Sequence, residues 1–296
     1  MMANSSGKRA LLIAGPTASG KSALALARAR AEGGVIVNAD ALQVYRELRI
    51  LSARPSHGEE MEMPHRLYGH VSGREAYSVA QWLADASRVM GEIWRDGGLP
   101  ILVGGTGLYF RAIEKGLADV PPVNPAIRKG WRDFTGDLHA ELQRRDPAMA
   151  ARLHPSDRQR LARALEVIEG TGRSLLAWQE EGEANALLQG VRVERILVDV
   201  PRIELYARAE SRFDAMMAAG ALDEVRPLLA FDSALPMMRA IGVPELSACL
   251  RGDITPDEAV SRAKQATRNY IKRQLTWWRG QGHDWSGNGP SPHAGT

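Results

Sequence analysis

Three short apolar runs lie in the first 104 residues of the chain, and a fourth lies near residue 195. Each run leads into polar residues, glycine or proline. A short apolar run that is bounded by turn residues predicts a buried strand. Helical patterns follow the first run, at residues 22–34, and the third run, from about Leu108. Strands that alternate with helices predict a parallel sheet with right-handed crossovers. We therefore expect an α/β core with strands at residues 9–14, 34–40, 99–104 and 192–200.

The pattern changes between the third and fourth runs. The segment DVPPVNP, residues 119–125, holds three prolines in seven residues, which is typical of a domain boundary. From about residue 125 to 180 the periodicity predicts helices alone, with Asn124 and Pro125 starting one helix and Ser156 and Gln159 forming a capping box for another. We expect a discontinuous core at 1–118 and 190–284, a helical insertion domain at 119–189 and a disordered tail at 285–296.

A long basic helix is predicted at residues 256–280. Thr255 and Glu258 form a capping box around Pro256. Lysine and arginine recur at every fourth position, and like charges at this spacing destabilise an isolated helix. A nucleic-acid backbone would compensate for the repulsion, although a solvated basic face is the simpler alternative. The stripe consists of Lys264, Arg268, Lys272 and Arg279.

Composition narrows the class of protein. The 296 residues are 44% hydrophobic and 25% charged, as in ordinary globular proteins. No apolar run reaches the ~20 residues that span a bilayer, and the polar start lacks the apolar core of a secretory signal. The single cysteine, Cys249, excludes an intrachain disulfide and a cysteine-based zinc site. We expect a cytoplasmic protein that makes no membrane contact and is a monomer.

The basic residues are almost all arginine. Only six of the 38 are lysine. Arginine makes planar, bidentate contacts to phosphate and stacks on bases, which favours a nucleic-acid partner. A coding bias toward arginine is the alternative, and composition alone does not separate the two.

The segment AGPTASGKS, residues 14–22, matches the phosphate-loop pattern G-x-x-x-x-G-K-[ST], with a predicted strand before it and a helix after it. Backbone N–H groups at the start of such a helix point at an anion, Lys21 adds a positive charge, and the Ser22 hydroxyl can bind Mg²⁺. We expect a diphosphate or triphosphate here, in a P-loop NTPase-like core. The predicted phosphate-binding residues are Gly15, Pro16, Thr17, Ala18, Ser19, Gly20, Lys21 and Ser22.

Two further segments belong to the same edge of the predicted sheet. Ligands of open parallel sheets bind beyond the carboxyl ends of the strands. Asp40 follows the second strand, and the GGTG segment with Thr106 follows the third. A carboxylate at this edge can accept a proton during a reaction, and Asp40 could cap a following helix as well, since the two roles are compatible. Thr106 could orient a reacting group or bind phosphate, with a simple turn residue as the alternative. We expect Asp40 and Thr106 to be catalytic residues.

Five motifs in this order and at these separations resemble the tRNA dimethylallyltransferase family, also called tRNA isopentenyltransferases, in its bacterial form. The resemblance covers about residues 9–282, and the motifs are GPTASGKS, NADALQVYRELRILSARP, LVGGTGLYF, SDRQRLARALEVIEGTGRSL and TRNYIKRQLTWWRG. It implies transfer of a dimethylallyl group from dimethylallyl diphosphate to the N6 amine of the adenosine 3′-adjacent to the anticodon of tRNA, with release of pyrophosphate. The phosphate loop would then hold the donor's diphosphate together with Mg²⁺.

The resemblance also implies roles for individual residues. Arg212 matches the arginine that the family places near the diphosphate, and Gln43 resembles the residue that reads base edges near the target. The QRLAR segment matches the part of the family that contacts the anticodon stem-loop. The implied tRNA-binding residues are Asp40, Ala41, Leu42, Gln43, Gln159, Arg160, Leu161, Ala162, Arg163, Arg239, Lys264, Arg268, Lys272, Arg273, Gln274, Trp277 and Arg279.

Three alternatives use the same motifs differently. A small-molecule kinase would bind ATP in the phosphate loop. An isopentenyltransferase for free adenine nucleotides would keep the chemistry, with less need of the basic helix and the insertion. An RNA-binding protein could use the loop only as a nucleotide switch.

Overall fold

The computed structural model describes residues 7–181, 186–281 and 285–287. Its centre is a six-stranded sheet in the order β3-β2-β4-β1-β5-β6, in which every neighbouring pair is parallel. The predicted α/β fold with a phosphate-loop core is confirmed. The strands are β1 (Arg9–Ala14), β2 (Gly34–Asn38), β3 (His65–Arg66), β4 (Leu99–Gly104), β5 (Arg192–Leu197) and β6 (Ser286–Gly287).

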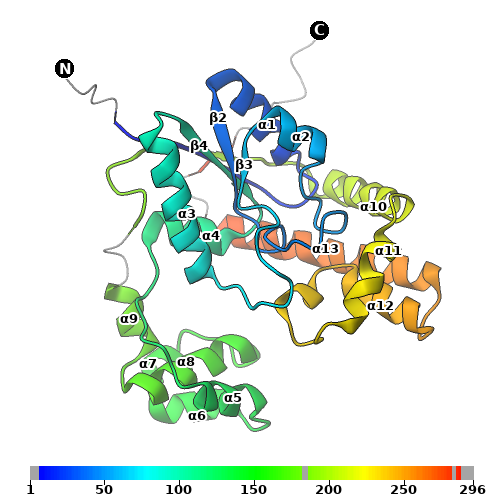
Figure 1. Ribbon diagram of the computed structural model, residues 1–296. Coiled ribbons are helices and arrows are strands. Elements are labelled where there is room, and N and C mark those ends of the chain that lie inside the picture. The colour runs from blue at the N-terminus through cyan, green and yellow to red at the C-terminus, as the bar shows by residue number, and fades with distance from the viewer. Residues whose placement is uncertain (1–6, 182–185, 282–284, 288–296) are drawn as a thin grey trace. The chain divides into compact units, whose positions relative to one another are not determined.

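Helices surround this sheet in the ribbon view (Figure 1). Among the described residues, none of them is both long and apolar enough to cross a membrane. In the unit that contains the sheet the helices are α1 (Lys21–Glu32), α2 (His57–Glu62), α3 (Val79–Arg95), α10 (Arg202–Ala218), α11 (Ala221–Val225), α12 (Val243–Arg251) and α13 (Pro256–Gln281), with short 3₁₀ helices at Arg226–Ala230 and Pro236–Arg239. The helix α4 (Gly107–Lys115) begins in this unit and ends in the next one along the chain.

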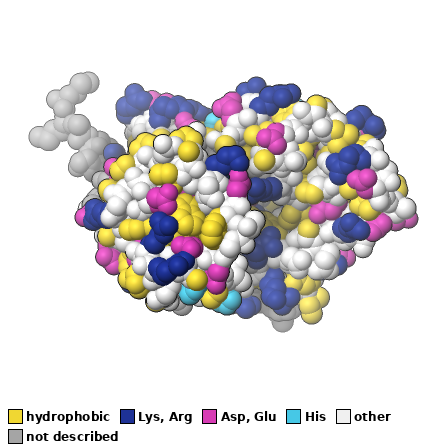
Figure 2. Space-filling model, turned by 90° about the horizontal axis from the view of Figure 1, so that it is seen from below, with side chains coloured by type: hydrophobic (Ala, Val, Ile, Leu, Met, Phe, Trp, Pro, Cys, Tyr) yellow, Lys and Arg dark blue, Asp and Glu magenta, His cyan; other side chains and the backbone are white. Residues whose placement is uncertain are grey.

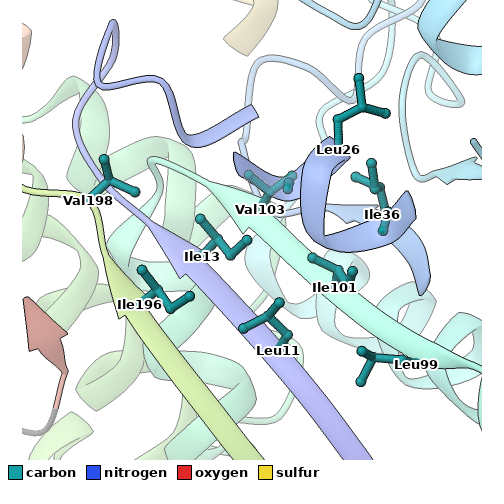
Figure 3. Close-up of a cluster of buried hydrophobic side chains, with 11 residues drawn as sticks. Leu11, Ile13, Leu26, Ile36, Leu99, Ile101, Val103, Ile196 and Val198 are labelled. Atoms are coloured by element: carbon teal, nitrogen blue, oxygen red, sulfur yellow. The ribbon is translucent and has the colours of Figure 1, made fainter. Parts of the chain in front are cut away.

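Alternating aliphatic side chains build the core under α1. Leu11 and Ile13 of β1 stand beside Ile101 and Val103 of β4, and Leu26 of α1 packs onto them (Figure 3). Successive residues of a strand point to opposite faces, so Leu12 and Leu102 cover the other face of the sheet. Burial on both faces explains why these strands read as nearly continuous apolar runs. This packing fixes the strands. Because they are parallel, the loops after their carboxyl ends meet at one edge of the sheet.

The chain divides into two compact units, residues 1–111 with 190–296 and residues 112–189. The described part of the second unit is helical, and its core packs Leu142, Leu161 and Leu165 against Trp131. Asn124 caps its first helix as expected, accepting the Ala126 N–H at 2.8 Å. Its helices are α5 (Pro125–Asp133), α6 (Leu138–Arg145), α7 (Pro147–Ala150), α8 (Arg158–Thr171) and α9 (Leu175–Glu181).

Two local predictions need correction, and one helix was not predicted. Asp157, not Ser156, caps α8 and accepts the Arg160 N–H at 3.2 Å, because the Ser156 hydroxyl is paired with His154. The tail does not begin as disorder, since Trp285 is buried and β6 pairs with β5; residues 288–296 lie outside the described residues. The helix α3 was not predicted, although the capping box of Ser78 and Gln81 marks its start.

Candidate active site

The phosphate loop joins β1 to α1 in the expected way. Gly20 adopts a left-handed φ of 90°, which allows the chain to turn sharply into the helix. Ala18 also has a positive φ of 65°, an uncommon conformation for a residue with a side chain. The Ser19 hydroxyl is buried without a hydrogen-bond partner, and the Ser22 hydroxyl lies exposed at the start of α1. Unpaired donors at a helix N-terminus are suited to an anion.

Two cations stand beside this loop. The Lys21 ammonium donates to the Pro16 carbonyl at 3.3 Å, and the Arg212 guanidinium of α10 donates to the Thr17 hydroxyl. Burial lowers the pKa of Lys21 from 10.5 to about 8, with the Asp40 carboxylate opposing this change and Arg212 adding to it. Burial also lowers the pKa of Arg212 from its usual value. Two desolvated positive charges side by side repel each other, and a bound polyanion would relieve that repulsion.

Asp40 is held in a defined orientation at the end of β2. Its backbone N–H donates to Asn38 Oδ1 at 2.8 Å, and Asn38 Nδ2 donates back to the Asp40 carbonyl at 2.9 Å. One carboxylate oxygen, Oδ1, accepts the Leu42 N–H at 3.0 Å. No helix follows at this point of the described chain, so the capping alternative is wrong and the contact is a turn. The carboxylate lines a pocket instead.

Thr106 lies next to this carboxylate. Its Oγ1 accepts the Ala41 N–H at 3.0 Å, so the hydroxyl supports the backbone that carries Asp40. The glycines before it are required by close packing, because a Cβ on Gly104 would stand 2.0 Å from the Ala39 carbonyl oxygen. A Cβ on Gly105 would stand 2.3 Å from Gln274 Nε2. Thr106 therefore contacts the backbone on both sides of Asp40, and its catalytic role stays a prediction.

A pocket opens between the phosphate loop, the Asp40 turn, α10 and α13. One side of it is polar and carries Thr17, Asp40 and Arg212. Burial raises the pKa of Tyr270 on α13, and the Asp40 charge raises it further, so this phenol stays a neutral hydrogen-bond donor. The other side is apolar, and its residues are Leu42, Leu51, Ala209, Phe213, Met216 and Ile241. Such a pocket fits a ligand with an anionic head and a small hydrocarbon tail.

The sequence analysis did not predict the apolar side of the pocket, nor Glu224, which holds the turn that carries Leu51. Glu224 of α11 accepts three backbone N–H groups, from Arg49 and Ile50 at 2.7 Å each and from Leu51 at 2.9 Å. A carboxylate that accepts several backbone bonds fixes the turn that presents Leu51 to the pocket. Nothing in the local pattern around Glu224 indicated this partner, because the two segments are about 175 residues apart.

The predicted basic stripe of α13 divides into two halves. The Thr255 hydroxyl accepts the Glu258 N–H at 3.3 Å, as the capping box predicted. Lys264 forms an ion pair with Asp214 at 2.7 Å, and Arg268 pairs with Glu210, so acids of α10 balance this part. In the second half, Lys272, Arg273 and Arg279 are exposed. On the face shown in Figure 2, Lys and Arg side chains lie among acidic and apolar ones.

The other predicted tRNA-binding residues have varied surroundings. Gln159 and Arg160 are exposed on α8 and Arg163 is half-buried beside Glu166, whereas Leu161 and Ala162 are buried in the core of their unit. The predictions for Leu161 and Ala162 therefore fail, since a buried side chain has no surface for RNA. Their spacing with Leu165 was the signal for burial.

Further positions lie in the unit of the sheet. The amide of Gln43 donates to the Ser52 and Ala53 carbonyls at 2.9 Å each, which holds the side chain in place, and its reading of a base edge stays a prediction. Arg239 is exposed. The Trp277 ring packs closely on Gly107, where an added Cβ would lie 2.3 Å from a ring carbon.

Gln274 is the remaining correction. Its side chain is buried, with 5% exposed, and both ends of its amide bind backbone of the site. This burial argues against the prediction that its side chain contacts tRNA.

Sequence comparison and structure comparison both find relatives of one kind. A family model described as IPP transferase matches residues 43–281, and one described as isopentenyl transferase matches residues 8–75. The tRNA dimethylallyltransferase of Methylobacterium nodulans is 54% identical over 285 residues, covering 94% of each chain. That of Rhodospirillum rubrum is 53% identical over 278 residues, covering 92% of this chain and 85% of the relative.

Two solved structures have the same fold. The tRNA isopentenylpyrophosphate transferase of Bacillus halodurans is 33% identical, with a TM-score of 0.67, and covers 93% of this chain and 88% of its own. A eukaryotic dimethylallyltransferase acting on tRNA is 26% identical, with a TM-score of 0.79, and covers 92% of this chain and 70% of its own.

Proposed function

The chain belongs to the IPP transferase family and transfers a prenyl group to tRNA, and on this premise we propose the donor site, the acceptor atom and the roles of the residues. Dimethylallyl diphosphate binds with its diphosphate at the phosphate loop. The acceptor is the N6 amine of the adenosine 3′-adjacent to the anticodon. The observation that carries this proposal is the pocket in which Asp40 and Arg212 share a lining with an apolar wall, with the Lys21 charge coupled to both.

The two ends of the donor match the two sides of the pocket. Lys21, Arg212 and the N–H groups at the start of α1 form the end of the site that binds the anionic diphosphate. The apolar wall with Phe213 and Met216 is suited to a five-carbon hydrocarbon tail. A kinase would need room for a nucleoside at this position, so the apolar wall favours the prenyl donor over ATP.

The reaction needs a proton acceptor and a stabilised leaving group. The N6 lone pair attacks C1 of the dimethylallyl group, the bond from C1 to the diphosphate oxygen breaks, and the N6 proton passes to the Asp40 carboxylate. The products are prenylated adenosine and pyrophosphate. Lys21 and Arg212 balance the charge that develops on the departing pyrophosphate.

A magnesium ion fits this donor set. In the described part of the chain, His, Cys, Asp and Glu do not gather in threes around a metal position. Mg²⁺ commonly takes one or two protein oxygens together with substrate phosphates and waters, and the exposed Ser22 hydroxyl at the start of α1 supplies such an oxygen. When bound, the ion adds positive charge to the leaving diphosphate.

For the acceptor, we propose that exposed arginines and lysines of both units contact tRNA. Arg160 on α8 and Lys272, Arg273 and Arg279 on α13 are exposed and carry the charge for contacts with phosphate and bases. The exposed Gln159 adds a neutral hydrogen-bonding group, and the half-buried Arg163 adds a further cation. The acceptor base must leave its stack to reach the Asp40 carboxylate. A monomeric, cytoplasmic enzyme remains our proposal from the sequence.

The deciding experiment combines the purified protein, Mg²⁺, unmodified tRNA and dimethylallyl diphosphate, followed by mass spectrometry of the digested nucleosides. We expect an adenosine that is heavier by one dimethylallyl group, formed only when tRNA and donor are both present. Free adenosine monophosphate in place of tRNA tests the nucleotide-prenylating alternative, and ATP in place of the donor tests the kinase. Unchanged tRNA together with consumption of ATP would overturn the proposal.

Donor binding should weaken as the pH rises past about 8. Lys21 has a pKa of about 8 before the donor binds, and its charged form is the one that attracts diphosphate. If only this form binds, the KM for dimethylallyl diphosphate rises about tenfold between pH 7 and pH 9. Steady-state kinetics at fixed ionic strength would measure this. The Lys21→Arg variant, which stays charged over this range, should have a nearly constant KM; a constant KM in the unaltered protein would contradict the assignment.

A further inference from the structure

We propose that Gln274 is a positioning residue, which sets the spacing between the diphosphate-binding loop and the Asp40 carboxylate. Its Oε1 accepts the Thr17 N–H at 2.9 Å, and its Nε2 donates to the Gly105 carbonyl at 3.0 Å. The side chain thus joins the phosphate loop to the GGTG segment, although these segments are far apart in the sequence. The inference rests on the proposed function, because it assigns donor and proton acceptor to the two segments.

Each end of the bridge leads directly to a reacting group. Thr17 accepts a hydrogen bond from Arg212 through its hydroxyl, next to the expected diphosphate position. Gly105 precedes Thr106, whose hydroxyl accepts the Ala41 N–H beside Asp40. A small displacement of one segment against the other would change the distance between the donor carbon and the proton acceptor. Transfer rates respond strongly to such misplacement, by up to about 100-fold for 1 Å.

The chemistry of the two contacts selects glutamine. One partner is an N–H group and the other is a carbonyl, so the side chain must both accept and donate. Glutamate would accept from Thr17 but would turn a second acceptor toward the Gly105 carbonyl. Methionine would fill the volume and satisfy neither group. The Thr17 N–H is also already paired, so the diphosphate must be held by other N–H groups of the loop.

The placement on α13 gives this bridge a second consequence. Gln274 is buried, whereas its neighbours Lys272 and Arg273 are exposed on the same helix. The helix that we expect to contact tRNA therefore touches the donor loop directly through its buried side. Loss of the bridge should disturb transfer without removing any of the exposed cations.

The test compares Gln274→Met with the unaltered protein. We expect the kcat for prenylation to fall about 10- to 100-fold, with the KM for tRNA changed by no more than about twofold. Gln274→Glu should lose at least as much. Thr276→Val, which removes an exposed hydroxyl bonded only to the Lys272 carbonyl of its own helix, is the control and should keep unaltered rates. Thermal unfolding shows whether each variant is folded.

Other outcomes separate the possible failures. A raised KM for tRNA with unchanged kcat would make Gln274 an RNA contact and would overturn the positioning role, as would unaltered kinetics. Calorimetry with inorganic pyrophosphate does not depend on turnover, and Gln274→Met should bind it about tenfold more weakly if the bridge shapes the loop. An unaltered protein that prenylates no tRNA would refute the proposed function, whereas unchanged pyrophosphate affinity in the variant would refute the bridge.

Discussion

Asp40→Asn should lower the kcat for prenyl transfer by about 10²- to 10⁴-fold, the range that a general base contributes. The amide keeps the shape of the carboxylate and can still accept the Leu42 N–H through its oxygen, so the turn after β2 should persist. What it loses is the ability to take the N6 proton. The affinity for tRNA should stay within about twofold of the unaltered value, because the change adds no bulk to the pocket.

The measurement is single-turnover transfer with the enzyme in excess over tRNA and with saturating donor, which reports the chemical step apart from product release. Asp40→Ala is the companion variant and should be slower still, since it also removes the contact to Leu42 N–H. A rate of Asp40→Asn equal to that of the unaltered protein would show that another group accepts the proton. In that case the phenol of Tyr270, which lines the same pocket, would be the next residue to replace.

Lys21→Met should lower the kcat/KM for dimethylallyl diphosphate by about 10²- to 10³-fold, as removal of one preorganised donor to a developing anion does in other enzymes. Methionine is similar in length and apolar, so it can occupy the buried space that the lysine stem fills. The ammonium charge is lost where pyrophosphate departs, and of the two cations beside the loop only Arg212 remains. Both kcat and KM should change, since the charge acts on bound donor and transition state alike.

Pyrophosphate binding by calorimetry and steady-state kinetics over a range of donor concentrations would check this result. Lys115→Met is the matched control, because this exposed lysine ends α4, outside the residues assigned to the site. Equal donor kinetics in Lys21→Met and Lys115→Met would remove the phosphate loop from donor binding. The proposed function would then need a different diphosphate site.

Much of the candidate site was visible in local patterns. The phosphate loop is recognisable because its glycines, lysine and serine must stand at fixed spacing to turn a strand into a helix around an anion. Asp40 and Thr106 could be placed near it, since both follow strands whose carboxyl ends meet at one edge. Apolar runs at β1 and β4 were strong signals, because those strands are buried on both faces.

The residues that sequence reasoning misplaced are those whose role depends on a distant partner. In the sequence, Lys264 and Arg268 belong to a stripe of like charges. In the structure α10 packs beside α13, and Asp214 and Glu210 of α10 form ion pairs with them. Leu161 lies in a motif associated with RNA contact but points into a core. A motif reports which segment is near the substrate, whereas burial decides which of its side chains can touch it.

By itself the sequence determined the α/β class, the phosphate loop, the edge at which Asp40 lies and the family whose chemistry these motifs share. The first three follow from short-range periodicity or from a fixed spacing along the chain, and the family follows from the resemblance of its five motifs. The tertiary structure alone decided the apolar wall of the pocket, the turn that Glu224 holds and the inward direction of Gln274. The hydrogen bonds of Glu224 and Gln274 join residues 169 or more positions apart, and such pairs form only when α11 and α13 pack against the loops of the sheet, which no local pattern encodes.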